Sequence, residues 1–283
     1  MVVRSKVTIP TLTGDKERTA YVYLPVGYDE RWCGCGQSCK TEGRCTGRVY
    51  GECPAPVKCG VTKRYPVLYM FDGHNLFTDE EATFGKCWGL EKYLDEHKTQ
   101  LIVCAVECNH EGDSRLSEYS PVPFDYHGKP VKGRGKKYMD WLTGVLKPSI
   151  DRDYRTLPDR EHTFIGGSSM GGLMTIYALA KYGDIFSGGA GLSPSLWVQR
   201  GEVPSFIVNS KFRKGTVLFT DYGTKEFKNH SQQMKLFGET VKILIEKGVA
   251  VTSRIVPGGT HSEASWEREI PYFMSVLGLD ESL

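Results

Sequence analysis

A glycine-rich segment near the middle of the chain holds the residue best suited to covalent chemistry. Gly167, Ser169 and Gly171 form the pattern G-x-S-x-G between an apolar run and a segment with helical spacing. A dinucleotide fingerprint needs G-x-G-x-x-G, and a phosphate-binding loop needs lysine where Leu173 stands, so the segment fits neither. The pattern is typical of a nucleophile elbow, a strained turn whose small neighbours leave room for an exposed serine hydroxyl. A glycine-rich turn with an incidental serine is the alternative.

A serine nucleophile needs a general base, and the order along the chain selects one histidine. Where a nucleophile elbow is catalytic, the serine comes first, then the acid, then the histidine. His261 lies in VPGGTHSEASW, directly after the last predicted strand, where the base belongs. His230 lies at the start of a predicted helix, where a solvated side chain is the simpler interpretation. The remaining histidines precede the serine: His74, His97, His110, His127 and His162.

The acid that orients the base is open between two residues. The segment after the predicted strand TVLFT offers Asp221 and Glu226. A carboxylate there would hold the imidazole in one tautomer and stabilise its charged form. The pattern alone favours Asp221, because it lies closer to the end of the strand.

Two backbone N–H groups are candidates for an oxyanion hole. One belongs to Met170, directly after the serine, and the other lies in Gly73-His74 within YPVLYMFDGHNLF. Such donors stabilise the negative oxygen of a tetrahedral intermediate. Without the elbow, DGHN would indicate no more than an Asp-Gly turn.

The elements that must position these residues alternate along the chain. Unbroken apolar runs at 65–71 and 101–107 predict strands buried on both faces, and the run at 162–167 leads into the elbow. Residues 6–10 and 19–24 predict an antiparallel pair. Further strands are predicted in FSGGAGLS, GTVLFTDYG and VTSRIVPGG, and helices at 87–97, 136–150, 173–183 and 229–247. The alternation predicts an α/β fold with a mainly parallel sheet, in a single domain over residues 1–283.

The composition is that of an ordinary globular chain. Of 283 residues, 40% are hydrophobic and 25% are charged, and the formal net charge is +2. A balance so near neutral offers no electrostatic surface for nucleic acid or for a membrane, so neither is expected as a partner. No apolar run approaches a membrane span and the N-terminus has no signal-peptide core, so we expect a cytoplasmic protein.

Cysteine is unusually frequent, with nine residues in the chain. Six of them lie within residues 31–60: Cys33, Cys35, Cys39, Cys45, Cys53 and Cys59. Disulfides would conflict with the missing signal peptide, and the spacing lacks the C-x-x-C pairs of a zinc site. Disulfides, a metal site and reduced thiols therefore all stay open. The composition marks 31–60 as a Cys-rich insertion between early strands, and an ordered insertion of this kind predicts a homo-oligomeric contact.

Seven segments, taken in order, resemble the Putative esterase family of α/β-hydrolases, which includes esterase D, feruloyl esterases and enterochelin esterases. They are YPVLYMFDGHNLF, CWGLEKYLDE, RLSEYSP, GGSSMGG, GLSPSLW, YGTKEF and GGTHSEASW. The resemblance covers nearly the whole chain except about residues 30–62. It implies the α/β-hydrolase fold, with a mainly parallel twisted sheet of about eight strands and helices on both faces.

The resemblance also implies roles for individual residues. Ser169 is then the nucleophile and His261 the base, and the family's G-x-x-[DE] position moves the acid from Asp221 to Glu226. His74 supplies the second oxyanion donor through its backbone N–H, beside that of Met170.

Three residues of the RLSEY segment and two tryptophans are candidates for the substrate pocket. Arg115, Glu118 and Tyr119 match a family segment that ties down the long loop near the pocket, with substrate contact by Arg115 as the lesser interpretation. Trp88 and Trp197 are candidate aromatic walls of the pocket, although core packing explains a tryptophan equally well.

The function implied is a serine carboxylic ester hydrolase that forms an acyl-enzyme on a small-molecule ester. Feruloyl, acetyl-sugar and siderophore esters are compatible, and GLSPSLW leans toward the enterochelin-esterase branch. No metal or organic cofactor is expected in the mechanism. The alternatives are an acyltransferase with the same triad and a non-catalytic binding protein.

Fold architecture also places the insertion and a lid. The second strand of this architecture is antiparallel to the rest, so the insertion at 31–60 begins and ends at the N-terminal ends of the parallel strands. Active sites lie at the carboxyl ends, so we expect the insertion to lie far from Ser169. Residues 108–135, which follow a strand at the carboxyl end, are the better candidate for a lid. Cys104, Cys108 and His110 could form a metal pocket, but Cys104 on a buried strand is better explained as core.

Overall fold

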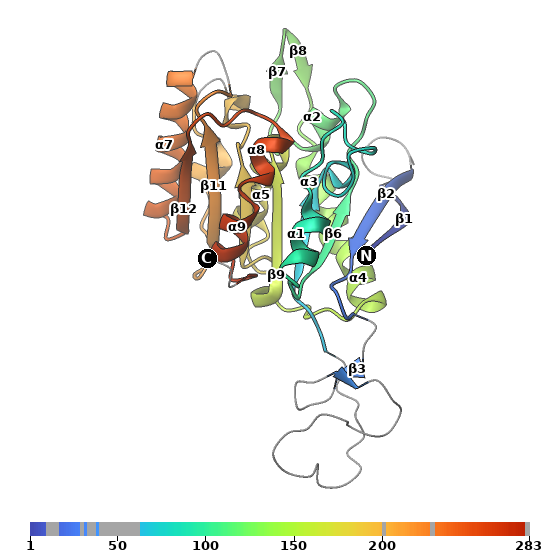
Figure 1. Ribbon diagram of the computed structural model, residues 1–283. Coiled ribbons are helices and arrows are strands. Elements are labelled where there is room, and N and C mark those ends of the chain that lie inside the picture. Colours follow the sequence, from blue (N-terminus) through green and yellow to red (C-terminus); the bar gives the residue numbers. More distant parts are fainter. Residues whose placement is uncertain are drawn as a thin grey trace.

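The computed structural model describes residues 1–9, 17–28, 31–32, 38–39, 63–199, 202–226 and 230–280. Its main sheet has eight strands in the order β1-β2-β6-β5-β9-β10-β11-β12 (Figure 1). Their bounds are Val2–Thr8, Glu17–Tyr23, Ile102–Val106, Val67–Phe71, Thr163–Ser168, Gly188–Leu192, Val217–Gly223 and Ala250–Val256, in that order. The sheet therefore has the strand number expected from the sequence.

The direction of the strands follows the expected pattern. β2 is antiparallel to both of its neighbours, β1 and β6, while β6, β5, β9, β10, β11 and β12 run parallel to one another. The predicted antiparallel pair and the mainly parallel sheet are both confirmed. Because parallel strands end at the same edge, the segments that follow β5, β6, β9, β11 and β12 meet there.

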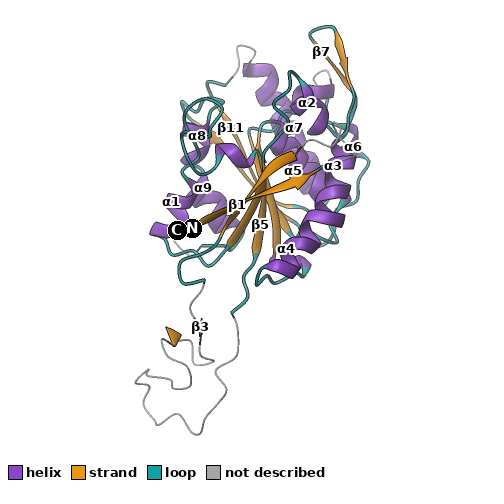
Figure 2. Cartoon of the chain, turned by 90° about the vertical axis from the view of Figure 1, so that its right-hand side faces the viewer, coloured by secondary structure: helices purple, strands orange, loops and turns teal. Residues whose placement is uncertain are grey.

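Helices cover both faces of the sheet (Figures 1 and 2). They are α1 Leu90–Glu96, α2 Ser114–Glu118, α3 Gly135–Trp141, α4 Lys147–Asp153, α5 Met170–Lys181, α6 Ser205–Val208, α7 His230–Glu246, α8 Glu263–Glu267 and α9 Ile270–Val276. None of the helices described is both long enough and apolar enough to cross a bilayer.

The central strands are apolar throughout because each of their faces packs against helices. Along β5, Tyr69 and Phe71 belong to the core shared with α3, α4, α5 and α7. The alternate residues Leu68 and Met70 belong to the core shared with α1, α8 and α9. Successive strand side chains point to opposite faces, so an unbroken apolar run is what a doubly covered strand requires.

Two predicted helices differ from their expected form. The segment expected as one helix over 136–150 consists of α3, a π-helical turn at Leu142–Leu146, and α4. The helix expected over 173–183 already begins at Met170, directly after the candidate nucleophile. Local hydrophobic spacing does not record either feature, because both depend on how the backbone packs against the sheet.

Smaller elements fill the connections. The 3₁₀ helices are η1 Gly73–Asn75, η3 Arg160–His162 and η4 Leu196–Gln199, and the short strands β3 Arg31–Trp32 and β4 Ser38–Cys39 pair with each other. The region proposed as a lid, 108–135, contains α2 and a hairpin of β7 Phe124–Tyr126 and β8 Lys129–Val131.

Between Tyr28 and Lys63, which precedes β5, the structure describes only β3 and β4. The rings of Tyr28 and Tyr65 lie 5.5 Å apart, so exit and return meet at the N-terminal ends of the parallel strands. This is the edge opposite the one where β9 ends. Most of the predicted insertion lies outside the described residues, as does the state of its six cysteines, and its distance from Ser169 stays a prediction.

Candidate active site

Ser169 occupies a sharp turn between β9 and α5. Its φ of 58° and ψ of −120° lie in a region that residues with a side chain rarely adopt, as a nucleophile elbow requires. The turn is fastened to the end of β10. The Ser169 N–H donates to Leu192 O at 2.9 Å, and the Ser195 N–H donates to Ser169 O at 3.0 Å.

The glycines of the motif are required by close approach to β5. A Cβ added at Gly167 would lie 3.0 Å from Phe71 Cβ, and one added at Gly171 would lie 2.9 Å from the same atom. Real Cβ atoms are essentially never found closer than 3.0 Å to another heavy atom. The elbow can therefore press against the end of β5 because Gly171 has no side chain, and a side chain at Gly167 would fit only if its neighbours moved.

His261 and Glu226 meet as base and acid should. His261 lies after β12 and Glu226 after β11, and Nδ1 of the imidazole lies 3.0 Å from Oε2 of the carboxylate. The Glu226 side chain is 1% exposed. Its other oxygen, Oε1, accepts hydrogen bonds from the Gly223 N–H at 2.6 Å and the Ser193 hydroxyl at 2.7 Å. Because Oε1 is held in this way, Oε2 is presented to the histidine in a fixed orientation.

A network that sequence reasoning missed extends behind this carboxylate. The Trp266 indole N–H donates to Ser193 Oγ at 2.9 Å, and the ring of His261 packs edge-on against Trp266 at 5.0 Å between centroids. Ser169 Oγ itself lies 3.2 Å from Ser195 Oγ. Ser193 and Ser195 both belong to the segment GLSPSLW. The sequence singled out this segment but predicted no role for its hydroxyl groups.

Asp221, the acid favoured by pattern alone, lies elsewhere. It is a residue of β11, 3% exposed, and its Oδ1 accepts a hydrogen bond from the Ser193 N–H at 2.7 Å. Burial raises the pKa of Asp221 to about 8, with Glu269 and Glu226 adding repulsion and the Ser193 N–H and Arg254 opposing it. The contact with His261 is made by Glu226, and Asp221 supports the backbone of the neighbouring turn.

A pocket of about 450 Å³ opens at this edge of the sheet. Ser169, His261, His74 and Arg115 are among the residues that line it. Cys108, Asn109, His110 and Gly112 also line it, so the start of the region proposed as a lid borders the pocket.

Arg115 ties α2 to the segment that holds His74. Its Nε and Nη2 donate to the two carboxylate oxygens of Asp72, each at 2.7 Å. Burial raises the pKa of Asp72, but the guanidinium outweighs burial and the pKa lies below its usual range. Asp72 has a left-handed φ of 56° and directly precedes η1. This contact matches the loop-anchoring role expected of Arg115.

The other two residues of RLSEY are buried beneath the loop. Glu118 is fully buried, and Arg18 Nη2 lies 3.7 Å from its Oε2. Burial raises the pKa of Glu118 to about 7 and the Arg18 charge opposes the rise. The hydroxyl of Tyr119 accepts a long hydrogen bond, 3.4 Å, from the Asp72 N–H. Both contacts hold the loop in place, away from the pocket lining that the structure describes.

The two predicted oxyanion donors follow adjacent strands. Met170 begins α5 after β9, and His74 lies in η1 after β5. The His74 imidazole is 5% exposed, and its Nε2 lies 2.9 Å from Thr83 Oγ1. Burial lowers the pKa of His74, which favours the neutral ring. The roles of the two backbone N–H groups stay a prediction.

Neither predicted aromatic wall is among the residues found to line the pocket. Trp88 is 2% exposed and packs against Trp266, with ring centroids 5.8 Å apart. Trp197 packs against Phe124 and Tyr126 of the β7–β8 hairpin, at 5.6 and 5.9 Å. The interpretation as core packing holds for Trp88, and Trp197 supports the hairpin. Sequence gives the residue type but not the direction of the ring.

Comparison with known proteins places the chain in a family. The family described as Putative esterase matches residues 42–272, which is more than half of the chain. The uncharacterized protein YbbA of Bacillus subtilis (strain 168) is 24% identical over 192 residues, covering 65% of this chain and 72% of YbbA.

Solved structures share the fold. The IroE-like serine hydrolase of Shewanella oneidensis superposes with a TM-score of 0.65 at 18% identity, covering 99% of this chain and 80% of that one. The siderophore hydrolase EstA of Aspergillus nidulans gives a TM-score of 0.63 at 16% identity, covering 97% and 94%. Sheet topology and these likenesses agree on the α/β-hydrolase fold. The chain therefore belongs to the Putative esterase family of ester hydrolases.

Proposed function

We propose that the chain is a serine carboxylic ester hydrolase in which Ser169, His261 and Glu226 form the catalytic triad. The observation that carries the proposal is the 3.0 Å contact between His261 Nδ1 and a buried, oriented Glu226, with His261 and an elbow serine lining the same pocket. A carboxylate at Nδ1 leaves Nε2 to act as the base.

In the first half of the reaction, the Ser169 hydroxyl turns from Ser195 toward the substrate and attacks the ester carbonyl. His261 takes the serine proton at Nε2, and Glu226 stabilises the imidazolium that forms. The negative oxygen of the tetrahedral intermediate accepts hydrogen bonds from the backbone N–H groups of Met170 and His74. The bond to the alcohol then breaks, and the leaving oxygen receives the proton from His261.

In the second half, water hydrolyses the acyl group from Ser169. His261 takes a proton from the water, which attacks the acyl carbonyl through a second tetrahedral intermediate. That intermediate collapses, the acid leaves, and the serine regains its proton from His261.

The substrate we propose is a small-molecule ester with an acyl part that fits a pocket of about 450 Å³. Two of the structures that share the fold are named as an IroE-like serine hydrolase and a siderophore hydrolase. These names are in keeping with a siderophore-type ester, which the GLSPSLW segment also favours, and feruloyl and acetyl-sugar esters stay as alternatives.

The test compares the wild type with Ser169→Ala on short p-nitrophenyl acyl esters. We expect the substitution to lower kcat by about 10⁶-fold, to the level of background hydrolysis. A fluorophosphonate probe should add its mass to Ser169 in the wild type and to no peptide of the variant. Unchanged hydrolysis by the variant, or labelling of a different residue, would refute the proposal.

A further inference from the structure

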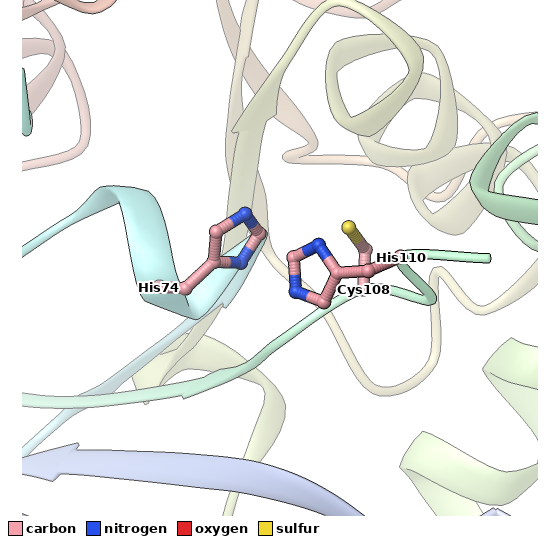
Figure 3. A group of neighbouring side chains, drawn as sticks. All are labelled: His74, Cys108 and His110. Atoms are coloured by element: carbon pink, nitrogen blue, oxygen red, sulfur yellow. The ribbon is translucent and has the colours of Figure 1, made fainter. Parts of the chain in front are cut away.

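Two histidines and a cysteine, His74, Cys108 and His110, lie close together after the ends of β5 and β6 (Figure 3). One ligand atom from each of His74, Cys108 and His110 lies within 4.8 Å of the other two. His74 follows β5, and Cys108 and His110 follow β6, so the ends of adjacent parallel strands bring them together. All three residues line the pocket that contains Ser169.

The sequence pointed to Cys104, Cys108 and His110 as a metal pocket, and the structure replaces one member. Cys104 is 1% exposed on β6 and belongs to the hydrophobic core, as its alternative interpretation expected. His74 takes its place in the cluster, although it lies 34 positions before Cys108 in the chain. Only the pairing of β5 with β6 makes this neighbour evident.

In each imidazole, one nitrogen contacts a neighbouring side chain and the other is available to bind a ligand. His74 Nε2 is hydrogen-bonded to Thr83 Oγ1, and its buried Nδ1 has no hydrogen-bond partner among the described residues. His110 Nε2 lies 3.4 Å from Glu107 Oε1. A buried ring nitrogen without a partner is costly and uncommon, so the Nδ1 atom of His74 itself points to a missing ligand.

The outer contacts are those that metal-bound histidines usually make. A ligating histidine commonly gives its second nitrogen to a carboxylate, a carbonyl or another oxygen, which fixes the ring. Glu107 stands in this position for His110, and Thr83 does so for His74. Thr83 is itself held, because its hydroxyl donates to Asn75 Oδ1 at 3.0 Å.

The donor set selects the kind of metal. Two imidazoles and one thiolate suit a borderline-soft divalent ion such as Zn²⁺, and three protein ligands leave a fourth position for water or substrate. Tetrahedral zinc with its usual bond lengths separates such ligand atoms by roughly 3.4–3.6 Å. Side-chain rotations would have to bring the three ligand atoms, now within 4.8 Å of one another, to that spacing.

We propose that His74, Cys108 and His110 form a Zn²⁺ site, and that the bound metal blocks the entry of ester substrates to Ser169. Binding requires the Cys108 thiol to release its proton to solvent, while the imidazoles contribute lone pairs, and no redox change occurs. The thiol then gives up its hydrogen bond to Asp72, whose charge Arg115 continues to neutralise. The blocking effect rests on the proposed function, whereas the binding does not.

The binding test uses Co²⁺ as a spectroscopic substitute for zinc in the full-length, metal-stripped protein. We expect a thiolate-to-cobalt absorption band that saturates and is displaced by Zn²⁺. Cys108→Ser should abolish the band, and His110→Ala should weaken Zn²⁺ binding more than about 100-fold. His110 is half exposed, so its variant folds even where a change at buried Cys108 is harmful.

Two matched controls separate this site from another buried thiol and from another histidine. Cys87→Ser changes another buried free thiol, and His162→Ala changes an exposed histidine at the opposite edge of the sheet. Both should keep the cobalt band and the affinity for Zn²⁺. A band that survives in Cys108→Ser and His110→Ala alike, or no band in the wild type, would overturn the site.

The activity test follows p-nitrophenyl ester hydrolysis and fluorophosphonate labelling of Ser169 in the presence of Zn²⁺. We expect both to fall as the site fills, and to recover when a chelator is added. His110→Ala should need more than about 100-fold more Zn²⁺ for the same inhibition. Binding without inhibition overturns the blocking step. A protein that binds cobalt but never hydrolyses an ester contradicts the proposed function and leaves the metal site standing.

Discussion

At the scale of single residues, the two buried acids near the candidate base illustrate how environment divides roles. Glu226 is turned toward His261 by two hydrogen bonds to its other oxygen, whereas Asp221 accepts a hydrogen bond from the Ser193 N–H. The pattern G-x-S-x-G and the order of the chain were sufficient to select Ser169 and His261. The choice between the acids needed the family resemblance, because a strand end cannot be located to the residue from sequence alone.

Exchanging each acid for its amide separates these roles. We expect Glu226→Gln to lower kcat by about 10⁴-fold with little loss of stability, because the amide favours the wrong imidazole tautomer. Asp221→Asn keeps an oxygen acceptor for the Ser193 N–H and should cost less than about tenfold. Steady-state kinetics on a p-nitrophenyl ester measure both. The reverse order of the two effects would assign the acid to Asp221.

The raised pKa of Asp221 predicts how stability depends on pH. Its folded pKa of about 8 lies above the unfolded value of about 4, so between these values the folded state holds a proton that the unfolded state has lost. This contribution to stability is complete below pH 4 and falls by up to about 1.4 kcal/mol per pH unit toward pH 8. In Asp221→Asn that fall is absent. Urea unfolding at several pH values between 5 and 8 gives the slope of the free energy of unfolding against pH for the wild type and for the variant. Equal slopes would contradict a raised pKa for Asp221.

At the scale of elements, the contact between the elbow and β5 decides whether a helix can begin beside the candidate nucleophile Ser169. α5 starts at Met170 because Gly167 and Gly171 allow the turn to press on Phe71. The sequence predicted the strand, the turn and the helix in the correct order. It placed the start of the helix three residues late, because the contact that fixes it comes from a strand about 100 positions away.

Two helical glycines provide a matched test of this contact. Gly171→Ala places a methyl group 2.9 Å from Phe71 Cβ, so we expect a loss of about 1–3 kcal/mol in the free energy of unfolding and reduced activity. Gly238→Ala on α7 meets no atom within 4 Å and should stabilise the protein by about 0.5–1 kcal/mol. Chemical denaturation measures both. Equal effects would mean that the elbow has room to relax.

At the scale of the whole molecule, the carboxyl ends and the N-terminal ends of the parallel strands lie at opposite edges of the sheet. The pocket lies where the parallel strands end, and the segment at Tyr28 and Lys63 lies where they begin. The alternating apolar runs and the family segments were sufficient to predict about eight strands, with the second strand antiparallel to the rest. They could not predict the Ser193, Trp266 and Glu226 network, because these side chains meet only after distant strand ends are brought together.

Replacing residues 31–60 by a short glycine-serine linker tests the separation of the edges. Because Tyr28 and Tyr65 already lie side by side, a short linker can join the two ends without moving β5. We expect kcat/KM for a small ester to stay unchanged, and any loss to appear in thermal stability or in oligomeric state by light scattering. A selective loss of kcat/KM in a folded protein would place the insertion in or over the pocket.

The lining of the pocket has a consequence for how such enzymes change. Its wall from Asp72 to Arg115 comes from one half of the chain, whereas Ser169 and His261 come from the other half. Most of the pocket lining is thus encoded by one stretch of sequence and the Ser169–His261 pair by another, although the proposed His74 oxyanion donor belongs to the first stretch. A crossover between relatives near residues 120–160 would exchange most of the pocket lining, together with the segment that holds His74, and leave Ser169, Glu226 and His261 unchanged. Diversification by recombination is then as accessible to this architecture as diversification by point substitution.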